Sequence, residues 1–447
     1  MTKQEAVINY ITDNYLQYNR LRHDVISDKL QIRLSGEEAM RLLGERQEYW
    51  REMTKNDINS IVCHCAQECD VNITSREVMT ALQSDLIPDV HPLREYVLSC
   101  REWTPDQPDW IDFVASQVKV RDSASSGVEE FRSSGVTSEQ AQSATEHSEP
   151  LTSGSNADAL WRACFKKWFV AMVASWMRDD VVNHQVLVLI GKQGIFKTTW
   201  LEHLIPPHLR AYACKLANSN DLNKDERLRI AEFGLISLDE IDSMNNRELN
   251  QLKSIITSTD VNERAAYAYS KERRVRLASF CASGNRKDFL TDITGNRRWL
   301  PFEVESIQNP FFTILPYDLM YAQAWALANN STFNYWFDLD EIETIEQHNQ
   351  QFRDESNEEQ LIDVYFSVPA EGAINAKFLT TAEISERLIY FGNIKRPLTL
   401  SRLGVLLSQK GFLSVRRGNP SRRGWIIYER ESQEVNSERS ILSKDLY

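Results

Sequence analysis

Three nearly continuous apolar segments lie in the middle of the chain, each of strand length. They are HQVLVLI (184–190), FGLISL (233–238) and LASFCAS (277–283). An apolar run without alternation is typical of a strand buried on both faces, as in a parallel sheet. Helical patterns lie between the runs, and a strongly apolar helical segment, WRACFKKWFVAMVASWM (161–177), precedes them. This alternation predicts an α/β domain over residues 156–345, with a parallel sheet and helices on both faces.

The segments before this domain have other patterns. Residues 1–120 carry apolar positions at three- and four-residue spacing, which predicts a helical N-terminal domain. Residues 121–155 contain ten serines and almost no large apolar side chain. Such a segment cannot bury enough surface to offset its ordering entropy, so we expect a disordered linker there.

Residues 375–430 predict a small basic domain. TAEISERLIYFG and TLSRLGVLLSQKG are capped helical patterns, each ended by Gly, and FLSVRR and WIIYER alternate as strands joined by the turn GNPSRRG. Helix, helix and hairpin in this order are the outline of a winged helix. Eleven Lys or Arg against three Glu give the segment a local charge of +8. We expect a helical connector over 346–374 and a flexible tail over 431–447.

The composition is that of a globular protein. Of 447 residues, 42% are hydrophobic and 26% charged, and no apolar run approaches the ~18 residues of a membrane helix. The N-terminus has no basic segment followed by an apolar one, so we expect a cytoplasmic protein without a membrane partner. The net charge of −13 argues against a protein coated in nucleic acid, although local basic patches remain compatible with it.

Seven scattered cysteines suit free thiols in a reducing compartment rather than a disulfide framework. Cys63, His64, Cys65 and Cys69 form a cluster that suggests a metal site. On a helix, however, Cys65 and Cys69 share a face while Cys63 points elsewhere, and paired Cys-x-x-Cys knuckles are absent from the sequence. Buried structural cysteines are therefore the favoured interpretation.

The first apolar strand runs directly into GKQGIFKTTW (191–200) and then into a helical pattern. Strand, Gly-rich loop, Lys-Thr and helix in this order predict a phosphate-binding loop, the alternative being a turn that binds nothing. Lys197 would reach the β- and γ-phosphates, and the Thr198 hydroxyl would hold Mg²⁺. Phe196 stands where the usual pattern has Gly. The expected nucleotide-binding residues are Gly191, Gln193, Gly194, Ile195, Phe196, Lys197, Thr198 and Thr199.

Polar residues also follow the other two apolar strands. The second strand ends in LDE (238–240), where Asp239 would hold Mg²⁺ directly or through a water and Glu240 would polarise the attacking water. The third ends in ASGN (282–285), where Asn285 is a candidate to orient water against a γ-phosphate. The alternatives are surface acids after a buried strand and an Asn in a tight turn.

Two arginines follow in TGNRRW (294–299). In ring ATPases an arginine of one subunit often completes the site of its neighbour by neutralising transition-state charge, so Arg297 and Arg298 are arginine-finger candidates. The alternative role is a surface salt bridge.

Two basic segments are candidates for contact with DNA. NERAAYAYSKERRVR (262–276) has five basic residues, two acids and two tyrosines, a composition that suits a nucleic-acid backbone and base stacking. A solvated face that holds the domain by ion pairs is the alternative. The second segment is the turn of the winged-helix pattern. The candidate contacts are Arg264, Tyr267, Lys271, Arg273, Arg274, Arg416, Arg417, Arg422 and Arg423.

GKQGIFKTTW, LISLDEIDS, ASGN and DITGNRRWLPFEV together resemble the virulence-associated protein E family over residues 95–345. That family is similar to the superfamily 3 helicases within the AAA+ ATPases of phages, plasmids and integrated elements. The resemblance implies a P-loop AAA+-like fold and an ATP- and Mg²⁺-dependent DNA motor or replication-initiation factor, acting as a hexameric ring. Members are often fused to a primase domain. Residues 1–120 contain no Asp-x-Asp primase signature, so a separate primase or replication protein is an expected partner.

Three functions remain open from the sequence. The leading one is a replicative, helicase-like ring that hydrolyses Mg²⁺-ATP while moving DNA. The main alternative is a nucleotide-switched assembly on DNA, a regulator or anti-phage defence component that hydrolyses ATP without unwinding. A DNA-binding regulator with an inactive ATP site would fit Phe196 but fits poorly with an intact Lys197, Thr198, Asp239 and Glu240.

Overall fold

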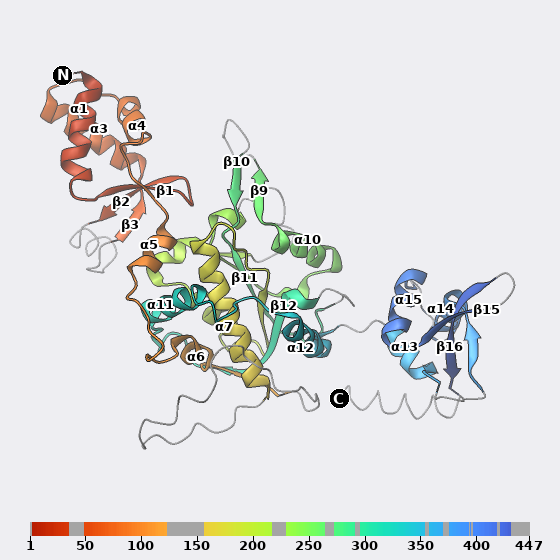
Figure 1. Ribbon diagram of the computed structural model, residues 1–447. Coiled ribbons are helices and arrows are strands. Elements are labelled where there is room, and N and C mark those ends of the chain that lie inside the picture. The colour runs from red at the N-terminus through yellow and green to blue at the C-terminus, as the bar shows by residue number, and fades with distance from the viewer. Residues whose placement is uncertain are drawn as a thin grey trace, which may run out of the picture. The chain divides into compact units, whose positions relative to one another are not determined.

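A computed structural model (Figure 1) gives the fold of the chain, and the residues it describes fall into two compact units. The first unit comprises Met1–Lys287 and Arg297–Gln351, and the second comprises Asp288–Asn296 and Phe352–Tyr447. The described residues are 2–34, 49–122, 156–216, 229–263, 272–290, 296–353, 357–369, 375–392, 394, 397–417 and 421–430. Most of the expected linker (121–155) and all of the expected tail (431–447) lie outside them.

A six-stranded sheet forms the centre of the first unit. Its spatial order is β5 (Val118–Val120), β12 (Trp299–Ile307), β6 (Val186–Ile190), β11 (Ser279–Gly284), β8 (Leu235–Leu238) and β7 (Ala213–Leu216). All neighbours are parallel except β5, which is antiparallel to β12. The three apolar runs are β6, β8 and β11, and every residue of these strands is buried. The predicted parallel sheet is therefore confirmed.

The parallel strands, numbered in chain order, lie in the spatial order 5-1-4-3-2. The first of them, β6, thus lies between the fourth and the fifth. The second, third and fourth strands lie on one side of β6, and the fifth lies on its other side. In open α/β sheets the crevice at the carboxyl end of such a strand is where ligands bind.

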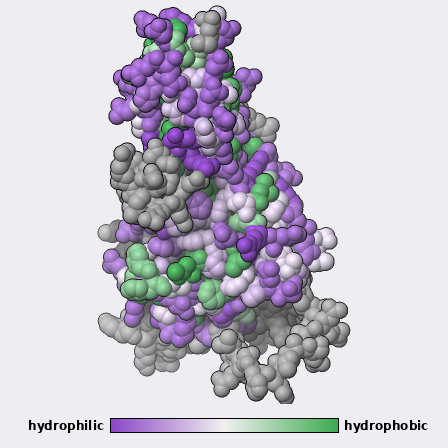
Figure 2. All heavy atoms as spheres, turned by 90° about the vertical axis from the view of Figure 1, so that its left-hand side faces the viewer, coloured by the Kyte–Doolittle hydropathy of each residue, from purple (hydrophilic) through white to green (hydrophobic). Residues whose placement is uncertain are grey.

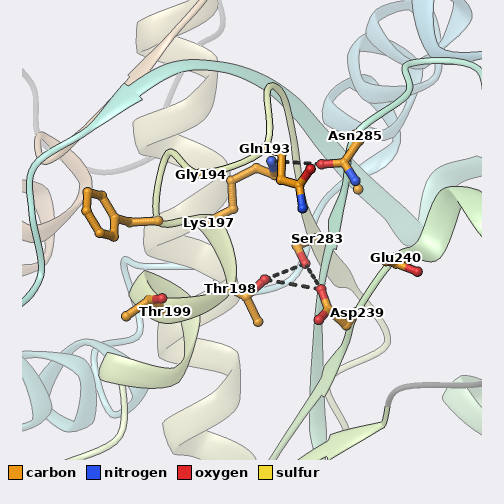
Figure 3. A pocket seen from close by; sticks show the side chains of 11 residues that line it. Gln193, Gly194, Lys197, Thr198, Thr199, Asp239, Glu240, Ser283 and Asn285 are labelled. Carbon is orange, nitrogen blue, oxygen red and sulfur yellow. Dashed lines mark hydrogen bonds between the residues drawn. The ribbon is translucent and has the colours of Figure 1, made fainter.

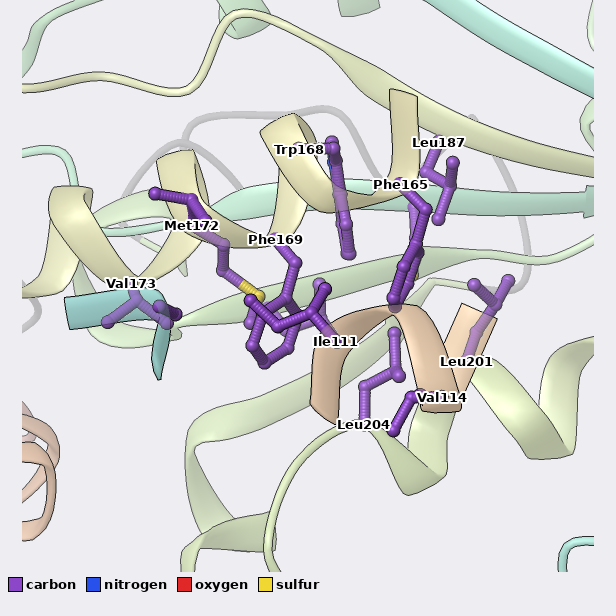
Figure 4. Packing of buried hydrophobic residues seen from close by; sticks show 14 of the residues in the cluster. Ile111, Val114, Phe165, Trp168, Phe169, Met172, Val173, Leu187, Leu201 and Leu204 are labelled. Atoms are coloured by element: carbon purple, nitrogen blue, oxygen red, sulfur yellow. The ribbon is translucent and has the colours of Figure 1, made fainter. Parts of the chain in front are cut away.

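Helix α7 (Asn156–Met177) is the main core helix of the first unit, and it packs with α6 (Trp110–Ala115) and α11 (Tyr317–Ala328). Figure 4 shows Phe165 and Trp168 of α7 between the sheet residue Leu187 and the neighbouring helices. The Trp168 indole donates a hydrogen bond to the Phe280 carbonyl of β11 (3.1 Å). A helix that is apolar on all sides is buried in this way. No described helix has the length and apolar character needed to cross a membrane.

Further helices surround the sheet: α5 (Pro92–Ser99), α8 (Lys197–His203), α10 (Asn246–Thr257) and α12 (Leu339–Asn349). Helix α12 is tied to β12 by hydrogen bonds to the backbone, from Asn349 to the Trp299 carbonyl (3.0 Å) and from His348 to the Pro301 carbonyl (2.8 Å). Strands β9 (Asp260–Glu263) and β10 (Glu272–Val275) form a separate antiparallel hairpin that projects from the sheet (Figure 1).

The N-terminal elements correct the expectation of a helical domain over residues 1–120. Helices α1 (Lys3–Ile11), α3 (Lys55–Cys69) and α4 (Ser75–Leu82) are present, but they pack with a four-stranded sheet of order β3-β2-β1-β4. The strands are β1 (Leu21–Asp24), β2 (Lys29–Leu34), β3 (Tyr49–Glu52) and β4 (Asp89–Val90). They are short, with two to six residues each, so no run of alternating residues is long enough to reveal them. On the face shown in Figure 2, polar side chains cover most of these elements.

The boundary at residue 120 is also displaced. Helices α5 and α6 and strand β5 belong to the central core, because β5 completes the six-stranded sheet and α6 packs on α7. The N-terminal sheet is joined to this core through Asp24, which is fully buried and accepts a hydrogen bond from the Tyr212 hydroxyl (2.8 Å). All seven cysteines are free thiols, and Cys65, Cys164 and Cys281 are buried.

The second unit contains the predicted helix, helix and hairpin. These are α14 (Thr381–Gly392), α15 (Leu400–Gln409), β15 (Leu413–Arg417) and β16 (Arg422–Glu429). Strand β16 also pairs with β14 (Lys377–Leu379) and β13 (Phe366–Ser367), and α13 (Asn357–Tyr365) lies within the expected connector. Trp425, Ile384 and Leu407 are among the buried residues of its own small apolar core.

A buried ion pair joins two helices of the first unit and can be tested. The Lys167 ammonium of α7 lies 2.5 Å from the Glu341 carboxylate of α12, and both side chains are almost fully buried. Removing one partner leaves an uncompensated buried charge, so we expect Glu341→Ala to lower the free energy of unfolding by about 3–5 kcal/mol. Denaturant unfolding measures this. Glu343→Ala, an exposed position on the same helix, should change it by less than about 0.5 kcal/mol. A Lys167→Met/Glu341→Leu variant as unstable as Glu341→Ala would contradict this account.

Candidate functional site

The loop after β6 turns through unusual backbone conformations. Gly194 has φ +85°, which glycine adopts without strain. At Gly191 the constraint is space, because a Cβ there would lie 2.7 Å from the Val304 carbonyl oxygen of β12. Phe196, which precedes α8, has φ +67°, a left-handed conformation that costs a non-glycine residue about 1–2 kcal/mol. The backbone at Phe196 therefore has a conformation that a glycine would adopt freely.

A cavity of about 310 Å³ opens at this loop, at the carboxyl ends of β6, β8 and β11 (Figure 3). Two predicted nucleotide-binding residues do not line it: Ile195 packs on the central core, and Gly191 lies against β12. The structure thus brings together residues that follow three separate strands. The lining residues are Gln193, Gly194, Phe196, Lys197, Thr198, Thr199, Asp239, Glu240, Ser283, Gly284 and Asn285.

The Lys197 ammonium lies inside the loop and makes three hydrogen bonds. It donates to the carbonyls of Gly191 and Lys192 (2.7 Å each) and to the Asn285 side-chain oxygen (3.3 Å). Burial lowers the pKa of Lys197, and the carboxylates of Asp242 and Asp239 oppose that shift. A cation held at this point is suited to a charge-assisted bond to phosphate, as the sequence predicts for this loop.

Thr198, Ser283 and Asp239 form a hydrogen-bonded triangle (Figure 3). The Thr198 hydroxyl lies 2.9 Å from the Ser283 hydroxyl, and both donate to the same Asp239 oxygen, at 3.2 and 2.8 Å. Two hydroxyls and a carboxylate are hard oxygen donors of the kind that Mg²⁺ prefers. The residues at this position therefore fit the predicted metal.

Lys215 of β7 completes the surroundings of Asp239. Its ammonium lies 2.7 Å from the second Asp239 oxygen. Burial alone would raise the pKa of Asp239, but hydrogen bonds from Lys215 and Ser283 bring it below its usual value. In turn, the hydrogen bond to Asp239 raises the pKa of Lys215. Asp239 is therefore held as a carboxylate, the form that a metal requires.

Glu240 and Asp242 follow Asp239 and differ in their surroundings. Glu240 is exposed, has φ +52°, and its carboxylate makes no hydrogen bond to the described residues. In Figure 3 it lies on the far side of the cavity from Thr199. Asp242 instead accepts from the backbone amides of Asn285 (3.1 Å) and Arg286 (3.2 Å). Asp242 thereby fixes the tip of β11, where the Asn285 side chain meets Lys197.

Three of these residues were not among the sequence candidates. Ser283 stands in the ASGN segment, and its alignment with β6 could have indicated that its side chain faces Thr198. Asp242 is the third acid of LDEID (238–242), a weak signal. Lys215 gives no local signal, because its position depends on the pairing of β7 with β8.

Arg297 and Arg298 lie at the opposite end of the sheet from the cavity. They directly precede β12, whose first residue, Trp299, pairs with the first residue of β6. The Gln185 amide, with its nitrogen toward them, donates to the carbonyls of Arg297 (2.7 Å) and Arg298 (3.1 Å). The loop begins one β6 length away, roughly 13 Å, so neither arginine belongs to the cavity of its own chain.

Three of the five candidates in the first basic segment, Arg264, Tyr267 and Lys271, lie outside the described residues. Arg273 and Arg274 belong to β10. The Arg274 guanidinium lies 3.9 Å from the Asp28 carboxylate and 3.6 Å from that of Glu232. Part of the positive charge of this hairpin is thus compensated within the chain.

The four arginines of the winged-helix hairpin are exposed and face each other in pairs. Arg416 lies opposite Arg423, and Arg417 lies opposite Arg422, in the register of β15 and β16. Like charges directly across a strand pair are destabilising. Arg423 donates to the Ser414 hydroxyl (2.9 Å), and the Arg417 guanidinium lies 6.0 Å from the centre of the Phe378 ring. The hairpin concentrates positive charge at both faces.

The strain at Phe196 can be measured with two substitutions. Phe196→Ala removes the ring but keeps a residue with a Cβ in the left-handed conformation, whereas Phe196→Gly removes both. We expect the glycine variant to be more stable than the alanine variant by about 1 kcal/mol, in spite of the greater freedom of its unfolded chain. Denaturant unfolding of both variants measures the difference. Equal stabilities would show that the backbone relaxes out of this conformation.

Comparison with known proteins gives one family match, to the virulence-associated protein E-like domain, over residues 139–354. No curated protein was found to match the chain. Among solved structures, two described as the A form apo structure of the NrS-1 C-terminal region have TM-scores of 0.44 and 0.38 and identities of 11% and 10%. Both align over 92% of this chain and 98% of their own. An apo structure of the same region has a TM-score of 0.40 and 10% identity, over 95% of this chain and 100% of its own.

The match spans the GKQGIFKTTW loop, the LDE and ASGN strand ends and the arginine pair. It confirms the resemblance drawn from these motifs. Residues 139–354 of this chain are similar to the virulence-associated protein E-like domain.

Proposed function

We propose that this protein is a Mg²⁺-dependent ATPase that works on DNA in the replication of a mobile genetic element. The observation that carries the proposal is the convergence of Lys197, the Thr198–Ser283–Asp239 triangle and Asn285 in one cavity. A buried cation for phosphate and a set of hard oxygen donors for Mg²⁺ lie side by side at the carboxyl ends of adjacent strands. This is the arrangement that phosphoryl transfer requires.

Each residue then has a role that follows from its position. Lys197 exchanges its bonds to the loop carbonyls for the β- and γ-phosphates. Thr198 and Asp239 hold Mg²⁺, which neutralises charge on the phosphates when it is bound. Asn285, placed by Asp242, orients the attacking water. Glu240 polarises that water, and its carboxylate is available for this because it makes no hydrogen bond to the described residues.

The proposal includes a ring of subunits, a hexamer by the family resemblance. Arg297 and Arg298 are too far from the cavity of their own chain to act there. At the opposite end of the sheet they can complete the site of a neighbouring copy as arginine fingers. The 5-1-4-3-2 strand order agrees with an AAA+-like domain.

DNA is the proposed partner of the winged-helix hairpin and of the β9–β10 hairpin. The two like-charge arginine pairs of β15 and β16 are unfavourable in the isolated unit, and phosphates would neutralise them. A separate primase or replication protein is a further proposed partner, from the family resemblance.

A second function is favoured by the geometry of the loop itself. Lys197 is bonded to carbonyls of its own loop, and the preceding Phe196 is strained. Slow nucleotide exchange and turnover would suit an ATP-switched assembly on DNA, a regulator or defence component. Two measurements separate these functions. A motor hydrolyses ATP faster when DNA is present and separates the DNA strands, whereas a switch does neither.

Two substitutions test the ATPase. Lys197→Ala should abolish hydrolysis and weaken nucleotide binding, because it removes the cation for the phosphates. Glu240→Gln should keep binding and lower turnover by about 10²–10⁴-fold, because it removes the base but no metal ligand. Calorimetry and a phosphate-release assay measure both effects. Glu343→Gln, an exposed position on α12, serves as the control. Normal turnover in Glu240→Gln would exclude Glu240 from the mechanism.

The winged-helix arginines predict how DNA affinity depends on salt. If each arginine neutralises one phosphate, the log–log slope of affinity against salt should become shallower by about 1.8 in the full chain carrying Arg416→Ala and Arg423→Ala. Arg76→Ala, an exposed arginine on α4, should leave the slope unchanged. Fluorescence anisotropy with labelled duplex DNA at several salt concentrations measures the slope. An unchanged slope in the double variant would favour protein docking as the role of this hairpin.

A further inference from the structure

The nucleotide cavity is bordered by aromatic side chains that the phosphate chemistry does not use. Phe196 lines the cavity, and its ring centre lies 6.4 Å from that of Phe311, at an angle of 82° between the planes. Phe311 is 69% exposed, although burial of an aromatic ring is strongly favourable. It belongs to the segment between β12 and α11, which is far from the loop in sequence.

The segment that presents Phe311 is ordered by Asn309. The Asn309 side-chain oxygen accepts from the Phe311 amide (3.0 Å), and its carbonyl accepts from the Phe312 amide (3.1 Å) and the Thr313 hydroxyl (3.1 Å). A second ring, His203 of α8, meets Phe311 edge to face at 5.6 Å. The rings of Phe196 and His203 therefore contact Phe311, while much of the Phe311 side chain remains exposed to solvent.

The geometry of the cavity gives the direction of a bound nucleotide. Asp239, Glu240 and Asn285 lie on one side of it, and the γ-phosphate must be there, where water is activated (Figure 3). Thr199 lies on the other side, so the sugar and base extend past it. His203, bonded through Nδ1 to the Thr199 carbonyl (2.7 Å), joins this side of the cavity to Phe311.

We propose that Phe311 is the stacking platform for the nucleotide base, with Phe196 and His203 holding its ring. This inference rests on the proposed ATP-binding function and adds the residue that contacts the base. Phe196 and His203 meet Phe311 at steep angles of 82° and 87°, and 69% of Phe311 stays exposed, which leaves ring surface available to an aromatic ligand. Because every base has a face that can stack, ATP and GTP should bind with similar affinity.

The test compares a ligand with a base to one without. Calorimetry on the full chain, with Mg²⁺, measures the affinity for ATP and for inorganic tripolyphosphate. Phe311→Ala should weaken ATP binding by about five- to a hundredfold and leave tripolyphosphate binding unchanged. Phe311→Tyr, which keeps the ring, should retain the ATP affinity. Ile314→Ala, a 91% exposed apolar residue of the same segment, should leave both affinities unchanged.

Four results would overturn the proposal. An equal loss for both ligands in Phe311→Ala would show that the substitution damages the phosphate loop. Unchanged affinities would remove Phe311 from the site, and unchanged affinities with a loss of self-association in sedimentation would assign the ring to contact with a second copy. When Phe311→Ala leaves the affinities unchanged, the wild-type chain still binds ATP, so the proposed ATP-binding function is not contradicted. A wild-type chain that binds neither ligand would instead end the proposed function as well.

Discussion

The register of three buried strands is the constraint on which the site depends. Gly284 of β11 pairs with Ile190 of β6, and Ala282 pairs with Leu238 of β8, so the three strands end at nearly one level. Asp239, Ser283 and the loop to Lys197 leave the sheet together for that reason. A slip of one residue in β11 would turn Ser283 to the other face of the sheet and separate it from Asp239. The buried side chains on both faces of these strands are what specify the register.

The buried cation Arg276 links the same strand to the basic hairpin. It follows β10 directly, and its guanidinium donates to carbonyls at the end of α10 and to that of Asn183 before β6 (2.9 Å). Burial lowers its pKa to about 9, and its described hydrogen bonds go to backbone oxygens. The base of the β9–β10 hairpin is thereby joined to the start of β11, whose other end carries Ser283 and Asn285.

Local sequence was sufficient where the determining contacts are local. The loop between β6 and α8, the acidic end of β8 and the second unit's helices and hairpin each depend on neighbouring residues, and these elements lie where the sequence predicted them. Lys215 was missed because it reaches Asp239 only through the pairing of β7 with β8. Strands β1 to β4 were missed because each has only two to six residues, too few for a pattern of alternating burial to stand out in the sequence. Sequence analysis of this chain therefore fails where the residues that determine a contact are far apart along the chain.

Backbone strain lies beside the cavity at the carboxyl ends of the strands. Phe196 and Glu240 both have positive φ, and both line this cavity. Non-glycine residues persist in such conformations only when the surrounding structure holds them. At Glu240, the hydrogen bonds from Ser243 to the Glu240 carbonyl (2.8 Å) do this. At Phe196, the following helix and the contact with Phe311 do so, which explains how a phenylalanine can occupy a position that favours glycine. The Cβ of Phe196 makes this conformation unfavourable for the backbone, while its ring joins the loop after β6 to Phe311 at the border of the cavity.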